Sequence, residues 1–140
     1  MTKIPLVAAS AGLLFATTAS ALAAKSVTSV QGPYNVQMTK SCLSDTGPTT
    51  VALYGKGSFT LSTRTLTLTG FEDSISPANT TAKETAIDIT EAYSYTSDSL
   101  TLGPITYHAY YQALVSGVAT IIAFGGIDSE GCIETGTLLR

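Results

Sequence analysis

The chain has 140 residues, a formal net charge of −3, two cysteines and no tryptophan. Its seven lysines and arginines are scattered, whereas proteins that bind phosphate backbones cluster their cations, so we expect no nucleic-acid partner. The length is that of one domain, large enough to bury a hydrophobic core.

The first 23 residues have the pattern of a cleaved secretory signal. Lys3 precedes an apolar segment of small residues, and Ala21-Leu22-Ala23 is the A-x-A pattern that precedes a cleavage site. Cleavage after Ala24 is the alternative. Polar residues dilute the segment below what a stable membrane span requires. We therefore expect residues 1–23 to be removed, and residues 24–140 to form one secreted or periplasmic domain without membrane contact.

After a polar leader over residues 24–31, short segments of alternating apolar and polar residues predict half-buried β-strands. The predicted strands cover residues 34–42, 49–61, 66–70, 87–95, 99–102, 105–115, 118–124 and 131–140. Gly55 and Gly57 fall on the inward face of the second strand, where glycine indicates a bend. Residues 72–84 lack a period and contain Pro77, which predicts a loop.

The first and last strands are complementary when they are laid antiparallel with residue numbers that sum to 174. The facing pairs are Tyr34 with Arg140, Val36 with Leu138, Met38 with Gly136, Lys40 with Glu134 and Cys42 with Cys132. Two cysteines in an exported chain indicate one disulfide. Arg140 would lie over the ring of Tyr34, and Lys40 and Glu134 would both face inward and form an ion pair.

Pairing of the first strand with the last closes a sheet and removes its exposed edges. The sequence therefore predicts an all-β fold: an antiparallel up-and-down barrel of about eight strands with one disulfide. A two-sheet β-sandwich, which needs longer crossovers, is the alternative.

Gly32-Pro33-Tyr34 opens the first strand and Arg140 lies on the last. This layout resembles the calycin group of lipocalin-like and avidin-like barrels, which begin with G-x-W and carry an arginine over that tryptophan. Tyr34 stands where the tryptophan would. The segments GKGSFTLSTRTLTLTG and AYSYTSDSLTLG are also similar to small secreted bacterial β-proteins without an assigned function. The resemblance implies a barrel and no specific ligand.

Four tyrosines share the inward parity of their strands: Tyr93, Tyr95, Tyr107 and Tyr111. Tyrosine rings offer apolar faces, and their hydroxyls can orient a ligand. The first hypothesis for function is therefore the binding of a small apolar or aromatic molecule in the barrel interior. The alternative is an ordinary aromatic core, because side chains alone can fill an eight-stranded barrel.

Two other functions stay open. A protein-binding module, such as a secreted or periplasmic protease inhibitor, would use residues 24–31 as a free, extended segment. A barrel-type isomerase or cyclase would need His108 or Glu91 in a polar pocket, and it is suggested by architecture alone.

The sequence lacks G-x-S-x-G and H-E-x-x-H, so we predict no catalytic residue. One histidine and an oxidised cysteine pair do not make a zinc site, and we expect no metal or cofactor.

Overall fold

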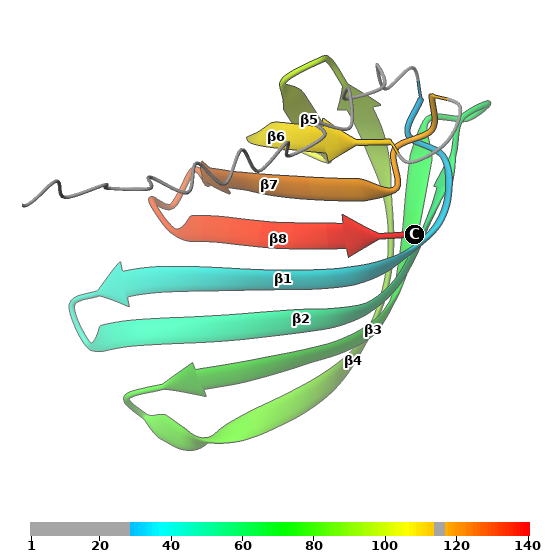
Figure 1. Ribbon diagram of the computed structural model, residues 1–140. Helices are drawn as coiled ribbons and strands as arrows, with labels where there is room; N and C mark the ends of the chain where they lie inside the picture. Colours follow the sequence, from blue (N-terminus) through cyan, green and yellow to red (C-terminus); the bar gives the residue numbers. More distant parts are fainter. Residues whose placement is uncertain (1–28, 114–116) are drawn as a thin grey trace, which may run out of the picture.

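The structure is a computed structural model that describes residues 29–113 and 117–140. The described residues form eight antiparallel strands in one closed sheet, joined in sequence order (Figure 1). The strands are β1 (Gly32–Ser44), β2 (Gly47–Thr60), β3 (Thr65–Ser76), β4 (Asn79–Tyr95), β5 (Ser99–Leu102), β6 (Ile105–Gln112), β7 (Ile121–Ile127) and β8 (Ile133–Leu139). The predicted barrel is confirmed in place of the alternative β-sandwich. The predicted signal at residues 1–23 lies outside the described residues.

The barrel closes through β1 and β8 in the predicted register. The ladder runs from Asn35 facing Leu139 to Ser41 facing Ile133. One residue beyond the ladder, Cys42 and Cys132 form a disulfide with Cα atoms 4.4 Å apart, as expected for directly opposed cysteines. The disulfide therefore joins the first and last strands at one end of their ladder.

Glycines allow β2 and β3 to approach closely. Gly55 faces Gly70 across the two strands. A Cβ atom on Gly55 would lie 2.2 Å from the carbonyl oxygen of Thr69 and 2.8 Å from the Cα atom of Gly70. No side chain larger than hydrogen fits there, and this steric limit explains why Gly55 occupies an inward position of β2. Figure 1 shows β1 to β4 curving strongly along their length.

Burial decreases along the long strands, which gives the barrel a core end and an open end. At the core end, Phe59, Leu66 and Tyr93 are each at most 7% exposed. Towards the open end, the inward side chains of Met38, Val51 and Leu53 are only half-buried. The barrel interior is therefore filled at the core end and partly accessible at the open end.

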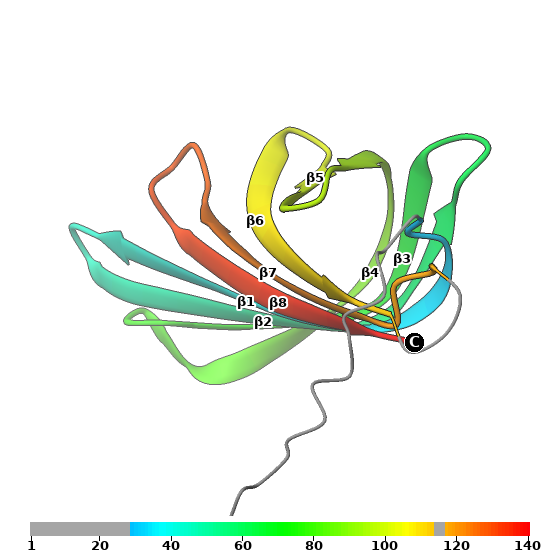
Figure 2. The same cartoon turned by 45° about the horizontal axis from the view of Figure 1, so that its top comes forward.

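Residues 72–84 do not form the predicted loop. β3 continues to Ser76 and β4 begins at Asn79, so a two-residue turn joins two long strands. Residues 79–86 are exposed at every position. A strand that is solvated on both faces has no reason to alternate apolar and polar residues, and this explains why the prediction was wrong. Figure 2 shows this hairpin projecting away from β5 and β6.

β6 and β7 also have other boundaries than predicted. β6 ends at Gln112, and β7 covers Ile121–Ile127 instead of residues 118–124. Val118 lies before β7, where it forms an isolated parallel bridge with Ser29. The backbone of Val118 therefore pairs with the N-terminal segment and is not part of a strand of the barrel wall.

The described end of the predicted leader is docked onto the barrel. Val30 is 0% exposed, and its carbonyl oxygen accepts a hydrogen bond from the Tyr93 hydroxyl at 2.8 Å. A protease inhibitor that inserts a free leader into its target would need this segment released, so the docking weakens that hypothesis. Within the described residues, no helix is both long and apolar enough to span a membrane.

Candidate functional site

The four predicted tyrosines point into the barrel, where they pack against its core. Tyr93 and Tyr107 are each 3% exposed, and Tyr95 and Tyr111 are partly buried. Tyr95 stacks on Tyr93 with ring centroids 6.2 Å apart and contacts Tyr111 at 6.5 Å. Tyr107 lies apart from this group and packs on Phe124 at 5.0 Å. The structure therefore brings three of the four tyrosines into one aromatic cluster.

Three of these tyrosines donate their hydroxyl protons within the chain. Tyr93 bonds the Val30 carbonyl, Tyr107 bonds the Glu134 carboxylate, and Tyr111 bonds the Ser99 carbonyl. Burial raises the pKa of each of the three hydroxyls. Rings in mutual contact with hydrogen-bonded hydroxyls are the arrangement of an aromatic core. Ligand binding by the four tyrosines stays a prediction.

Two arginines lie against the aromatic residues of the core end. The Arg64 guanidinium lies 5.2 Å from the ring centroid of Tyr95 and 6.0 Å from that of Tyr93. Such cation–π contacts stabilise by about 0.5–1 kcal/mol at exposed sites. Arg140 donates to the Gln31 carbonyl at 3.2 Å. Burial raises the pKa of Tyr34, and the nearby Arg140 opposes this rise. The placement of Arg140 over the Tyr34 ring stays a prediction.

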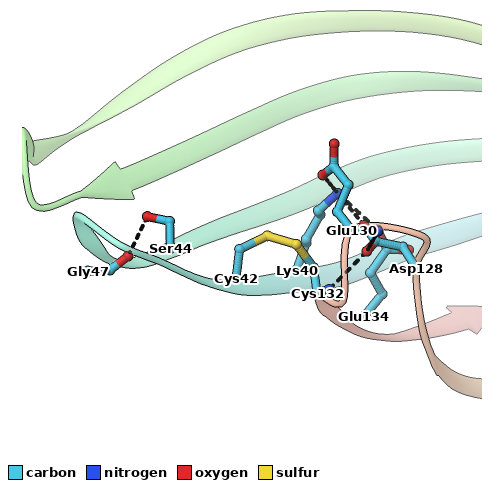
Figure 3. Close-up of a disulfide and its surroundings, with 8 residues drawn as sticks. All are labelled: Lys40, Cys42, Ser44, Gly47, Asp128, Glu130, Cys132 and Glu134. Carbon is cyan, nitrogen blue, oxygen red and sulfur yellow. Dashed lines mark hydrogen bonds and ion pairs between the residues drawn. A yellow bond between two sulfur atoms is a disulfide. The ribbon is translucent and has the colours of Figure 1, made fainter.

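A charged cluster surrounds Lys40 beside the disulfide (Figure 3). The Lys40 ammonium lies 2.5 Å from Asp128, 3.4 Å from Glu130 and 3.6 Å from Glu134. Asp128 also accepts the backbone N–H groups of Glu130 and Cys132, each at 2.9 Å. Glu134 is 3% exposed and accepts the Tyr107 hydroxyl. The inward pair Lys40 and Glu134 is thus part of a larger network.

The charged cluster is arranged for an ammonium group and not for a metal ion. Ligand atoms of Asp128, Glu130 and Cys132 lie within 4.8 Å of one another, but the Cys132 sulfur is bonded to Cys42. The Lys40 ammonium contacts both carboxylates. The hydrogen bond to Asp128 raises the pKa of Lys40 to about 12, and the same contact lowers the pKa of Asp128.

We expect the stability of the protein to depend on the cluster at both ends of the pH range. The folded pKa of Asp128 lies below its usual value of 3.8. Its contribution is therefore complete above that value and is lost as pH falls through the folded pKa. The pKa of Lys40 rises from 10.5 to about 12, so its contribution is complete below 10.5 and is lost as pH rises through the folded pKa.

Urea unfolding of the wild type and of Lys40→Met, measured from about pH 2 to pH 12, tests this expectation. The variant should lose part of the pH dependence at both ends. Lys56→Met, which removes an exposed lysine from β2, is the matched control and should retain it. Identical pH profiles for Lys40→Met and the wild type would contradict the assignment.

A shallow groove, wide open to solvent, crosses the outer face of the sheet, on the side opposite the core. One hollow of about 520 Å³ lies over β8, β1 and β2, and an adjoining hollow of about 860 Å³ lies over β1 to β4. Gln37 and Tyr54 line both hollows, so we treat them as one outer groove. The other lining residues with polar side chains are Asn35, Thr39, Lys56, Thr69, Asp88, Thr135 and Thr137.

Two aromatic rings lie side by side in the outer groove. Tyr54 is 38% exposed and Phe71 is 43% exposed. They face each other across β2 and β3, with ring centroids 5.9 Å apart and planes inclined by 34°. The Tyr54 hydroxyl donates to Glu84 at 2.7 Å, and this bond raises the pKa of Tyr54 to about 12. The hydrogen bond holds the Tyr54 ring in position within the groove.

The outer groove was not predicted from the sequence, although one signal for it was present. On β2 and β3, most outward positions carry threonine, serine or lysine, and Tyr54 and Phe71 are the aromatic residues at outward parity there. Large aromatic side chains on a solvated face indicate a contact surface. The pairing of β2 with β3 was needed to show that the two rings are neighbours.

His108 and Glu91 do not share a site. His108 is exposed on the outer face of β6 and lines a hollow of about 120 Å³ together with Asp98 and Ser99. Glu91 is half-buried on the inward face of β4, and its carboxylate lies against Gly103. The barrel wall separates the two side chains, so they cannot act as the acid and base of one isomerase or cyclase site.

Comparisons of the chain with protein-family models, with curated proteins and with solved structures found no match. The candidate sites are therefore weighed by their own chemistry. Of the three, the aromatic cluster is packed and the carboxylates of the charged cluster already hold the Lys40 ammonium, whereas the outer groove has exposed rings beside exposed hydrogen-bonding groups.

Proposed function

We propose that this protein is an exported binding protein that holds a carbohydrate in the outer groove. The observation that carries the proposal is the exposed pair of Tyr54 and Phe71 in a hollow of the sheet. A sugar ring presents an apolar face of C–H groups that stacks on aromatic rings, and its hydroxyls need donors and acceptors around that face. The disulfide and the predicted secretory signal support export.

The polar side chains of the groove suit such a ligand. Phe71, Tyr54, Gln37 and Thr137 face one another in a single row across β3, β2, β1 and β8. Adjacent strands lie about 4.8 Å apart, so the row extends about 14 Å, which is long enough for more than one sugar ring. Lys56 and Asp88 flank the row, and they add a charged donor and a charged acceptor for hydroxyl groups.

Isothermal titration calorimetry with cello-, chito-, malto- and laminari-oligosaccharides tests the proposal. At least one series should bind, and Tyr54→Ala and Phe71→Ala should each weaken binding about tenfold, because each removes a stacking surface. Tyr110→Ala is the matched control, since Tyr110 is a 64% exposed tyrosine on the outer face of β6, outside the groove. Failure of every series to bind, or equal losses in all three variants, would contradict the proposal.

Binding of a small apolar or aromatic molecule in the interior is the second candidate. It is supported by the open end, where Met38, Val51 and Leu53 line a hollow of about 140 Å³ with Lys40, Glu72 and Glu134. Ligand pockets usually measure several hundred Å³, and this ranks the interior below the outer groove. Native mass spectrometry of protein from its own host tests it: a copurified apolar molecule whose occupancy falls in Leu53→Gln would favour the interior.

A further inference from the structure

β4 has a long edge without a neighbouring strand. β5 pairs with β4 only from Tyr93 to Tyr95, whereas β3 pairs with β4 along almost its whole length. Between Asn79 and Glu91, no strand within residues 29–113 and 117–140 pairs with the edge of β4 that faces away from β3. Figure 2 shows this part of the hairpin separate from β5 and β6.

The backbone hydrogen bonds show which residues of β4 face this edge. Tyr93 donates to Arg64 on the β3 side, and Ala92 accepts from Gly103 on the β5 side. Alternate residues of an antiparallel strand direct their N–H and C=O groups to opposite sides. The even-numbered residues of the regular ladder therefore present free backbone donors and acceptors at the edge: Glu84, Ala86, Asp88 and Thr90.

None of the four charged residues on this part of β4 forms an ion pair within the described residues, and two of them, Lys83 and Glu91, share the inward face. Glu91 is a half-buried carboxylate on the inward face, and Lys83 is an exposed cation eight positions before it. Neither takes part in the salt bridges of the described chain. Both lie at odd-numbered positions, so they point to the same face of the sheet. An antiparallel strand with the same sequence would carry the charge that each of them lacks.

We propose that two copies of this chain associate through their β4 edges, as antiparallel strands related by a two-fold axis, with Ile87 facing Ile87 of the second copy. Lys83 then faces Glu91 of the second copy, and this ion pair occurs twice because the interface is isologous. Ala86 and Asp88 exchange backbone hydrogen bonds, as do Glu84 and Thr90. The half-buried Ile87 gains an apolar neighbour, and the free edge becomes a paired one.

Neighbouring registers either oppose like charges or leave Lys83 and Glu91 without a partner. Centring the pairing on Ala86 would oppose Glu84 to Asp88 of the second copy, and centring it on Asp88 would oppose that carboxylate to itself. Centring on Thr85 would leave Lys83 opposite Ile87. The charges of β4 thus select the register centred on Ile87. A two-fold axis perpendicular to the sheet keeps both outer faces on one side, so both outer grooves would open in the same direction.

Light scattering coupled to size-exclusion chromatography tests the dimer on the full secreted chain. The wild type should be a dimer, and Lys83→Glu or Glu91→Lys should each raise the dimer dissociation constant about tenfold, because each opposes like charges at two symmetric positions. The double variant with both substitutions should restore dissociation to near the wild-type value. A monomeric wild type at millimolar concentration, or a double variant no tighter than the single ones, would overturn the proposal.

Amide hydrogen exchange gives a second test that needs no substitution. The amides of Ala86 and Asp88 should exchange more slowly as the protein concentration rises, because dimerisation would bond them to the second copy. The amide of Ile87 is the internal control, since it faces β3 and is paired in the monomer. Exchange at Ala86 and Asp88 that does not change with concentration would also overturn the proposal.

Discussion

Removal of the disulfide is expected to lower the free energy of unfolding by about 4 kcal/mol, because Cys42 and Cys132 enclose a long loop. Their separation is 90 positions, and a cross-link over such a loop restricts the unfolded chain strongly. The bond also joins the two strands that close the barrel, where Asp128 accepts the Cys132 amide. The loss should therefore be measured for Cys42→Ala/Cys132→Ala by urea unfolding.

The reduced wild type, measured under the same conditions, is the control. It lacks the disulfide but keeps both cysteine side chains, so it does not contain the small voids that alanine leaves. Reduced wild type and the double variant should unfold at similar urea concentrations, both well below the oxidised protein. A difference between oxidised and reduced protein of less than about 1 kcal/mol would mean that the unfolded chain is already held together by other contacts, contrary to the chain-entropy account.

The substitution Gly55→Ala is expected to destabilise the fold by about 3 kcal/mol, at the upper end of the usual cost of overpacking. The new Cβ atom would meet the Thr69 carbonyl oxygen at 2.2 Å and the Gly70 Cα atom at 2.8 Å. Both are backbone atoms of β3, so no side-chain rotation can relieve the contact. The two strands would have to separate where their hydrogen-bonded ladder is continuous.

Gly125→Ala is the matched control, because a Cβ atom at Gly125 would come no closer than 3.4 Å to the Thr135 methyl group. This contact is ordinary, and alanine should cost little there or stabilise slightly. Thermal unfolding of both variants separates the steric effect at β2 from the general effect of adding a methyl group to a strand. Equal midpoints for the two variants would refute the close approach of β2 and β3.

The closure of the barrel could be predicted from the sequence because side chains on facing strands must match. Lys40 with Glu134 and Cys42 with Cys132 are complementary at a spacing of two, and a one-residue slip would turn every side chain to the wrong face. The contact of Asp128 with Lys40 was not predicted, because Asp128 lies in the turn before β8. It reaches Lys40 through the fold of that turn, which the alternation of strands does not describe.

The positions of the four tyrosines along their strands predicted that they face inward, but these positions could not show whether side chains fill the barrel interior. That depends on which rings meet across strands: Tyr95 lies between Tyr93 and Tyr111, and Arg64 covers one side of the group. The outer groove likewise depends on the β2–β3 register. The resemblance to calycins stays a prediction, since it rests on the position of Tyr34 and Arg140 and names no ligand.

The most direct test of carbohydrate binding is a nuclear magnetic resonance titration of the isotope-labelled protein with the oligosaccharide that binds best in calorimetry. The backbone amide signals of Gln37, Tyr54 and Phe71 should shift with ligand concentration, and those of Tyr93 and Tyr111 should stay in place. Shifts confined to the tyrosines of the interior would contradict the outer groove as the binding site.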